Sequence, residues 1–105
     1  MTKRNLLEFL NHEEIAPYFR AMPSRVVKKE QDFSDLRGNL FRMDRVVFDE
    51  DRIFVIDYKT GTDKEAEKEY ILQLKNYMRI LKEIYPDKNV GGVIAYVDLK
   101  EIKKV

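Results

Sequence analysis

Apolar positions follow two different periods along this chain of 105 residues. Near the N-terminus they recur every three or four positions, which predicts a helix that begins after Thr2 and that Pro17 ends or kinks near Ala16. A second stripe of the same period predicts a long helix that follows the capping-box pair Thr62 and Glu65 and ends at Pro86. The apolar positions of the first helix are Leu6, Leu7, Leu10, Ile15, Tyr18, Phe19 and Met22, and those of the second are Tyr70, Leu74, Tyr77, Met78, Leu81 and Ile84 or Tyr85.

Four other stretches are typical of strands, namely residues 26–33, 40–48, 53–59 and 90–97. The last of them, VGGVIAYV, is almost continuously apolar, which predicts a central strand covered on both faces. Its paired glycines permit close approach of a helix. The tail from Asp98 to Val105 fits either a strand or a helical turn. The order of helix, three strands, helix and strand predicts an α/β fold with a mixed central sheet flanked by helices.

The loop between the second and third predicted strands fixes their register. A loop of Glu50-Asp51 and a loop of residues 49–52 give the same pairing, in which Phe48 faces Ile53, Val46 faces Val55, Asp44 faces Asp57 and Arg42 faces Lys59. Opposed residues share a face of the sheet, so the two carboxylates are expected about 4.5–5.5 Å apart at Cβ. At that separation they repel by roughly 3 kcal/mol at an effective dielectric constant of 20. A three-residue loop or a bulge would change this register.

Two interpretations of the opposed acids are open. They either belong to a ladder of charges on a solvated face or form a partly buried site with Lys59 beside them. Apolar residues on both faces favour the site, because a solvated face is usually polar. One face carries Val46, Phe48, Ile53 and Val55, and the other carries Phe41, Met43, Val47, Phe54, Ile56 and Tyr58. Two hard oxygen ligands beside a cation are typical of a divalent metal site that also binds phosphate.

Composition limits the function classes. The chain is 37% charged and 44% hydrophobic, which indicates one folded domain over residues 1–105. It has no cysteine, which excludes disulfides, cysteine zinc sites and thiol catalysis. The net charge of +1 does not by itself indicate nucleic acid, although Arg20, Arg25, Lys28 and Lys29 form a modest basic cluster that is either solvated or meets phosphates. No apolar run has the length of a membrane span and no signal-peptide pattern is present, so we expect a cytoplasmic protein without membrane contact.

Three motifs occur in order: RMDRV at residues 42–46, VIDYKTG at 55–61 and QLKNY at 73–77. Together they resemble the PD-(D/E)XK nuclease superfamily, and most closely the RecB-like nuclease domains found at the C-terminus of AddA-type helicase–nucleases. The resemblance covers roughly residues 25–97 and implies a restriction-endonuclease-like αβββαβ core. The chain is then either a compact relative or a truncated domain of a larger helicase–nuclease.

The resemblance also implies roles for individual residues. Asp44, Asp57 and the backbone carbonyl of Tyr58 would bind Mg²⁺ or Mn²⁺, and Lys59 would position the attacking water or stabilise charge on the phosphate.

Three further residues have open roles. Gln73 and Tyr77 share a helix face and would line the cleft, although a solvated Gln73 and a purely structural Tyr77 are equally good readings. Glu30 is either a further metal ligand or DNA contact, or an ordinary strand residue.

These roles imply a metal-dependent DNA nuclease that hydrolyses phosphodiester bonds. We expect an exonuclease in DNA recombination or repair that acts on single strands or duplex ends. Helicase domains or subunits are the expected partners. The alternative is a catalytically weak or inactive DNA-binding or scaffold module of a helicase complex. The short chain and the absence of an obvious histidine motif support the alternative, since His12 is interpreted as a surface residue near a helix start.

Overall fold

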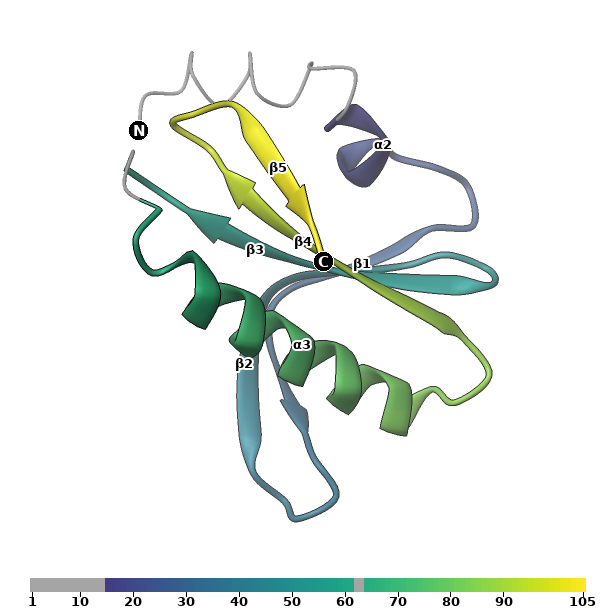
Figure 1. The fold of residues 1–105 in the computed structure, drawn as a ribbon. Coiled ribbons are helices and arrows are strands. Elements are labelled where there is room, and N and C mark those ends of the chain that lie inside the picture. The colour runs from purple at the N-terminus through teal and green to yellow at the C-terminus, as the bar shows by residue number, and fades with distance from the viewer. Residues whose placement is uncertain (1–14, 62–63) are drawn as a thin grey trace.

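The strands of the protein form one mixed sheet in the order β1-β2-β3-β4-β5, as seen in the computed structural model, which describes residues 15–61 and 64–105 (Figure 1). They are β1 (Val26–Ser34), β2 (Leu40–Phe48), β3 (Arg52–Lys59), β4 (Asn89–Tyr96) and β5 (Glu101–Lys104). The helices within the described residues are α2 (Ala16–Phe19) and α3 (Glu67–Ile84). The four predicted strands are thereby confirmed. Residues 1–14, with most of the predicted first helix and His12, and the capping residue Thr62 lie outside the described residues.

The connections explain why the sheet is mixed. β1, β2 and β3 form an antiparallel meander, and α3 then returns the chain so that β4 pairs in parallel with β3. The ambiguous tail becomes β5, which pairs antiparallel with β4 after a turn closed by a hydrogen bond from Lys100 N to Val97 O. Among the helices within the described ranges, none combines the length and apolar character needed to cross a membrane.

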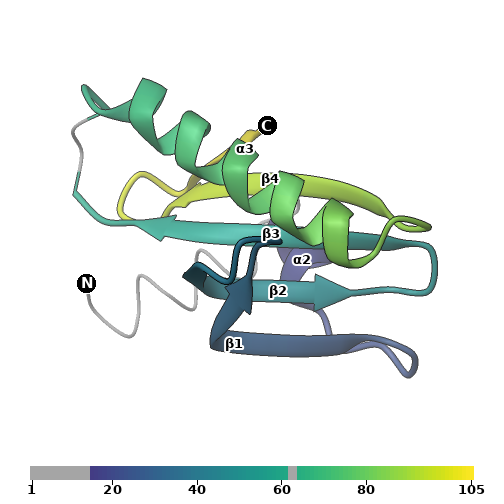
Figure 2. The same ribbon diagram turned by 90° about the horizontal axis from the view of Figure 1, so that it is seen from below.

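The two described helices pack on opposite faces of the sheet, and Figure 2 shows α3 along one of them. The apolar stripe predicted for α3 points at the sheet, where Leu74, Tyr77, Ile80 and Leu81 are buried. At Gly92 a Cβ would lie 3.0 Å from Leu74 Cγ, so this glycine permits the close approach of α3 to β4. Both faces of the central strands are therefore covered, as predicted.

The boundaries of α2 and α3 can be compared with the sequence prediction. Pro17 lies in the first turn of α2 and does not terminate a helix there, because amides of a first turn have no intrahelical acceptor to lose. The prediction that Pro17 ends or kinks a preceding helix near Ala16 stays a prediction, because most of that helix lies outside the described residues. α3 begins at Glu67 after Ala66, which makes no side-chain cap, so Glu65 precedes the helix. At the other end Tyr85, not Ile84, packs inward, with its ring 5.3 Å from that of Phe48.

The outer half of the β1–β2 hairpin bends over the α3 face (Figure 2). The bend coincides with Glu30, whose φ of 47° is in the left-handed region. It breaks the alternation of side chains along β2, since Met43 packs in the α3 cluster whereas Val47 packs in the α2 cluster. Phe41 also packs against the α3 cluster. The prediction that Phe41 and Met43 share a face with Val47 was therefore wrong, because a regular strand was assumed through Asp44.

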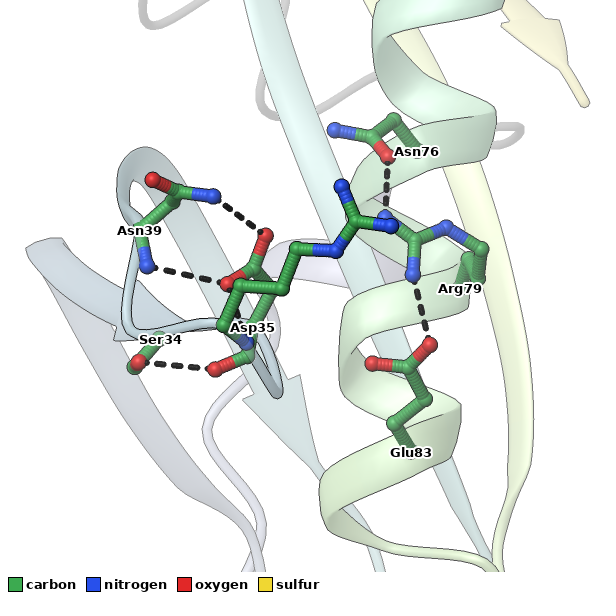
Figure 3. A network of polar contacts seen from close by, with 7 residues as sticks. Ser34, Asp35, Asn39, Asn76, Arg79 and Glu83 are labelled. Atoms are coloured by element: carbon green, nitrogen blue, oxygen red, sulfur yellow. Dashed lines mark hydrogen bonds and ion pairs between the residues drawn. The ribbon is translucent and has the colours of Figure 1, made fainter.

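The tip of this hairpin lies beside α3 (Figure 3). Asp35 holds the turn by accepting hydrogen bonds from the amides of Arg37 and Asn39 and from Asn39 Nδ2. A cavity of 420 Å³ separates the tip from Arg79 and Glu83 of α3. The bend and the tip together fold the hairpin over the same helix that faces the two predicted acids.

Candidate metal centre

Asp44 and Asp57 lie on the α3 side of the sheet, at the point where β2 and β3 separate. The predicted register is confirmed from Phe48↔Ile53 to Arg45↔Ile56, and the ladder ends there. Asp44 is the next residue of β2, and its Oδ2 accepts a hydrogen bond of 3.0 Å from the amide of Tyr58. The Asp44 side chain thus joins the two strands where backbone pairing has stopped. The predicted pairings of Asp44 with Asp57 and of Arg42 with Lys59 are absent from the ladder between β2 and β3. Arg42 pairs instead with Asp32 of β1.

Asp57 is a buried acid with an incompletely satisfied carboxylate. The residue is 8% exposed. Its Oδ2 lies 3.0 Å from Lys59 Nζ in an ion pair but accepts no properly aligned hydrogen bond. Burial raises the pKa of Asp57, the Lys59 ammonium opposes that rise, and the neighbouring Asp44 carboxylate adds to it. The Asp57 carboxyl is therefore harder to ionise here than it would be in water.

Lys59 is held from two sides. Besides its ion pair with Asp57, its Nζ lies 4.3 Å from the centroid of the Tyr70 ring on α3. Sequence reasoning assigned Tyr70 only to the apolar stripe. Its position three residues before Gln73 and seven before Tyr77, on one helix face, was the signal that could have placed it at the site.

Gln73 and Tyr77 contact each other on the face of α3 that overlies the acids. Gln73 Nε2 donates a hydrogen bond of 2.9 Å to the Tyr77 hydroxyl. Tyr77 is 8% exposed, and its ring packs on Phe41 of the bent hairpin. Burial raises the pKa of Tyr77, and the charges of Asp57 and Asp44 raise it further. The structure thus brings Tyr77 within electrostatic reach of both acids, while Gln73 is exposed on one side.

Glu30 is not gathered with the acids. Its Oε2 lies 3.8 Å from Arg42 Nη2, and both side chains are largely exposed. Over residues 15–61 and 64–105, no group of three or more Asp, Glu, His or Cys side chains is placed to hold a metal ion. The centre therefore offers two carboxylates, and Glu30 belongs to the outer hairpin.

The donor set fits a hard divalent cation. Asp57 Oδ2 is buried and is paired with the single ammonium of Lys59, and Asp44 supplies a second carboxylate beside it. A divalent cation would offset the repulsion between the two acids, and two carboxylates with waters and a phosphate satisfy Mg²⁺. The prediction that the Tyr58 carbonyl is a ligand stays a prediction.

A family model of the PD-(D/E)XK nuclease superfamily matches residues 1–105. The chain belongs to this superfamily, whose members are usually metal-dependent nucleases acting on DNA. The RecB-like and AddA-type subdivision stays a prediction. No curated protein matches the chain significantly.

Among solved structures, the chain is similar to an fdxN element excision controlling factor from Anabaena variabilis. The two share 10% sequence identity with a TM-score of 0.51, and the alignment covers 98% of this chain and 99% of that chain. At that identity the likeness concerns the fold alone. The mixed sheet with its helices is compatible with the predicted restriction-endonuclease-like α/β fold.

Proposed function

We propose that the protein is a metal-dependent nuclease that hydrolyses DNA phosphodiester bonds, with Asp44, Asp57 and Lys59 as its catalytic set. The observation that carries the proposal is the buried Asp57 carboxylate, which lies beside the second carboxylate of Asp44 while one ammonium, that of Lys59, is ion-paired to it. Two acids beside one ammonium leave a negative charge that the protein does not neutralise here, and a bound cation would neutralise it.

Each residue has a role that follows from its position. Asp44 and Asp57 would hold Mg²⁺ or Mn²⁺, with the Tyr58 carbonyl as a candidate third ligand. The amide of Tyr58 fixes Asp44, so the carboxylate is oriented before any ligand arrives. When bound, the cation would supply Lewis-acid stabilisation of the phosphate and lower the pKa of a coordinated water.

Lys59 would stabilise the additional negative charge that develops on the phosphate. Its ammonium is confined between the Asp57 carboxylate and the Tyr70 ring, and its side chain is 23% exposed. A charge that is fixed in place before the reaction stabilises the transition state with little reorganisation. Tyr77 and Gln73, bonded to each other, would form the helix side of the same centre and contact the DNA or the lysine.

We further propose exonuclease action on single strands or duplex ends in recombination or repair, with helicase domains or subunits as partners. This finer assignment depends on the RecB-like motif order alone. Linear and circular DNA of the same sequence distinguish exonuclease from endonuclease action, because an exonuclease leaves a closed circle intact. Degradation of both forms at equal rates would contradict the exonuclease assignment and leave the nuclease proposal in place.

The nuclease proposal is tested by incubating linear DNA and Mg²⁺ or Mn²⁺ with the protein and with Asp57→Asn and Lys59→Met. Matched controls are Asp32→Asn and Lys75→Gln, which change exposed residues of the same types. We expect both site variants to lose about 100-fold or more in rate, as when a single group that stabilises the transition state is removed, while the controls remain active. Equal rates for all five proteins would contradict the proposal.

A non-cleaving DNA-binding module is the alternative function. One observation favours it: across the described part of the chain, no third acidic or histidine ligand joins Asp44 and Asp57. It predicts salt-dependent DNA binding without metal-stimulated cleavage. Retained Mn²⁺ binding in calorimetry together with no cleavage of any DNA form would favour this alternative over the nuclease.

A further inference from the structure

A second charged centre lies on the face of the sheet opposite the acids. Lys29 of β1 and Arg45 of β2 are directly opposed across the ladder and line a cavity of 280 Å³ together with Phe19, Arg20 and Arg25. This is the α2 face, because the Arg45 guanidinium lies 4.7 Å from the centroid of the Phe19 ring and Val47 packs in the α2 cluster. Among the described residues that line the cavity, none is acidic.

Arg45 is a buried cation that has no counter-charge among residues 15–61 and 64–105. The residue is 8% exposed, and its Nε has no hydrogen-bond acceptor. Burial raises the pKa of the neighbouring Tyr58 hydroxyl, and the Arg45 guanidinium opposes that rise. A phenol carries no charge at neutral pH, so Tyr58 does not neutralise Arg45. A buried charge is costly unless it is paired and hydrogen-bonded, so an acceptor from outside the described chain is expected here.

Arg25, in the same wall, shows how this fold satisfies a buried arginine. Its Nε and Nη2 donate to the two carboxylate oxygens of Asp49 at 2.8 and 3.0 Å, and its Nη1 donates to the carbonyls of Pro17 and Arg20. Arg25 therefore adds little free charge to the cavity. The contrast singles out Arg45, which has no carboxylate partner among the described residues and whose Nε has no acceptor there.

Lys29 makes the absence of an anion more costly. Like charges directly opposed across a sheet are destabilising, and Lys29 faces Arg45 in the register. Neither Lys29 nor the exposed Arg20 has an acidic partner among the described residues. Three cations thus converge on one cavity, and a multiply charged anion would relieve the repulsion that this arrangement creates.

We propose that the cavity between Phe19, Arg20, Lys29 and Arg45 binds a phosphate group. Phosphate carries more than one negative charge and several acceptor oxygens, and a guanidinium fork matches its geometry. A single carboxylate would leave two of the three cations without a counter-charge. The phosphate belongs either to a nucleic-acid strand or to a free phosphate compound, and these sources share the same recognition chemistry.

The test measures thermal unfolding and phosphate binding by calorimetry in buffer with EDTA, so that it is independent of the proposed nuclease centre. Inorganic phosphate is compared with acetate at equal ionic strength. The variants are Lys29→Gln and Arg45→Gln, and the control is Lys28→Gln, which removes the same charge from the neighbouring residue, whose Nζ lies over the Phe48 ring on the other face. Lys29→Gln is decisive if Arg45→Gln fails to fold, because Lys29 is exposed.

We expect phosphate to raise the unfolding temperature of the wild-type protein and of Lys28→Gln, and acetate to have little effect. Lys29→Gln should weaken phosphate binding about 10- to 100-fold, as expected for loss of a charge-assisted hydrogen bond. Equal shifts with phosphate and acetate, or equal phosphate binding by Lys29→Gln and Lys28→Gln, would overturn the proposal.

The source of the phosphate is found by measuring binding of a short single-stranded oligonucleotide in the same buffer. If the site binds nucleic acid, inorganic phosphate competes with the strand and Lys29→Gln weakens strand binding more than Lys28→Gln does. If the site binds a free phosphate compound, the two variants bind the strand equally while Lys29→Gln loses affinity for inorganic phosphate. Both results support a phosphate site.

Discussion

The ammonium group of Lys59 lies 3.0 Å from the carboxylate of Asp57, and the two residues are separated along β3 by Tyr58 alone. Residues two apart in a strand share a face, so the pair is built into the backbone and does not depend on distant packing. One ammonium cannot neutralise both Asp57 and the adjacent Asp44. Burial and this second acid together raise the pKa of Asp57, which gives the centre an electrostatic signature that can be measured without DNA.

The first prediction is that Asp57→Asn stabilises the metal-free protein at neutral pH. Because the pKa of Asp57 is raised in the folded state, ionisation of its carboxyl costs more there than in the unfolded chain. That cost is absent below the ordinary pKa, grows as the pH rises through the folded-state pKa, and is complete above it. Asparagine cannot ionise, so we expect a gain of about 1 kcal/mol, or roughly 4–8 °C in unfolding temperature.

Thermal unfolding in EDTA at pH 7 and at pH 3 tests this prediction. The difference between Asp57→Asn and the wild-type protein should shrink at pH 3, where the wild-type carboxyl is protonated. Asp32→Asn on the exposed side of β1 is the control and should change little. A variant that is less stable than the wild-type protein at pH 7 would contradict the electrostatic interpretation.

The second prediction concerns the metal itself. Mn²⁺ should raise the unfolding temperature of the wild-type protein, because a ligand that binds only the folded state adds about 2.7 kcal/mol when its concentration is 100 times its Kd. The effect should weaken as the pH falls, since protons compete with the ion for the Asp57 carboxylate, whose pKa is raised. Scanning calorimetry over a Mn²⁺ series measures it, with Asp57→Asn as the variant that should not respond. An equal response of both proteins would place the ion elsewhere.

Sequence reasoning predicted that Asp44, Asp57 and Lys59 lie near one another because the short loop at residues 49–52 constrains the register. A loop of two or of four residues gives the same pairing, and the observed register from Phe48↔Ile53 to Arg45↔Ile56 agrees with it. The same reasoning missed the bend at Glu30, because a glutamate carries no signal for left-handed backbone. It missed Tyr70 and the burial of Arg45 because each depends on which helix packs over that point of the sheet, and this is not a local property of the sequence.

The third prediction follows from the bend. Glu30→Gly should stabilise the protein by about 1 kcal/mol, since glycine adopts positive φ without the steric cost that a Cβ imposes. Gln31→Gly, the next residue of β1, should instead destabilise by about 0.5–1 kcal/mol, because glycine weakens a regular strand. Urea unfolding of both variants provides the comparison. Because Glu30 makes only an exposed contact with Arg42, Glu30→Gly should also keep the Mn²⁺ response. Loss of the Mn²⁺ response would indicate that Glu30 contributes to the metal site.

The fourth prediction is that the Arg25–Asp49 pair dominates acid unfolding. Hydrogen bonds from Arg25 lower the pKa of Asp49. The pair therefore contributes stability that is present above the ordinary pKa of aspartate and is lost as the pH falls through the lowered one. Asp49→Asn should cost about 3 kcal/mol at pH 7, because it leaves a buried guanidinium poorly paired.

Urea unfolding from pH 7 down to pH 2 tests the pair. The stability difference between the wild-type protein and Asp49→Asn should close as the pH falls. Asp51→Asn, in the same loop but exposed, should change stability by less than about 0.5 kcal/mol. Equal losses in the two variants would show that general loop charge, and not the Arg25 pair, is responsible.

The fifth prediction tests the packing that holds α3 over the acids. A Cβ at Gly92 would lie 2.6 Å from Met78 Sδ and 3.0 Å from Leu74 Cγ, and Leu74 is fully buried and cannot easily move. Gly92→Ala should therefore cost about 1–3 kcal/mol through overpacking. Gly91→Ala is the matched control on the other face, where the new methyl would meet only the Phe54 ring at 3.3 Å. Because the clash displaces α3 and loosens the contact of Tyr70 with Lys59, Gly92→Ala should also weaken the Mn²⁺ response. Equal stability of Gly92→Ala and Gly91→Ala would contradict the prediction, because it would show that α3 can shift without cost.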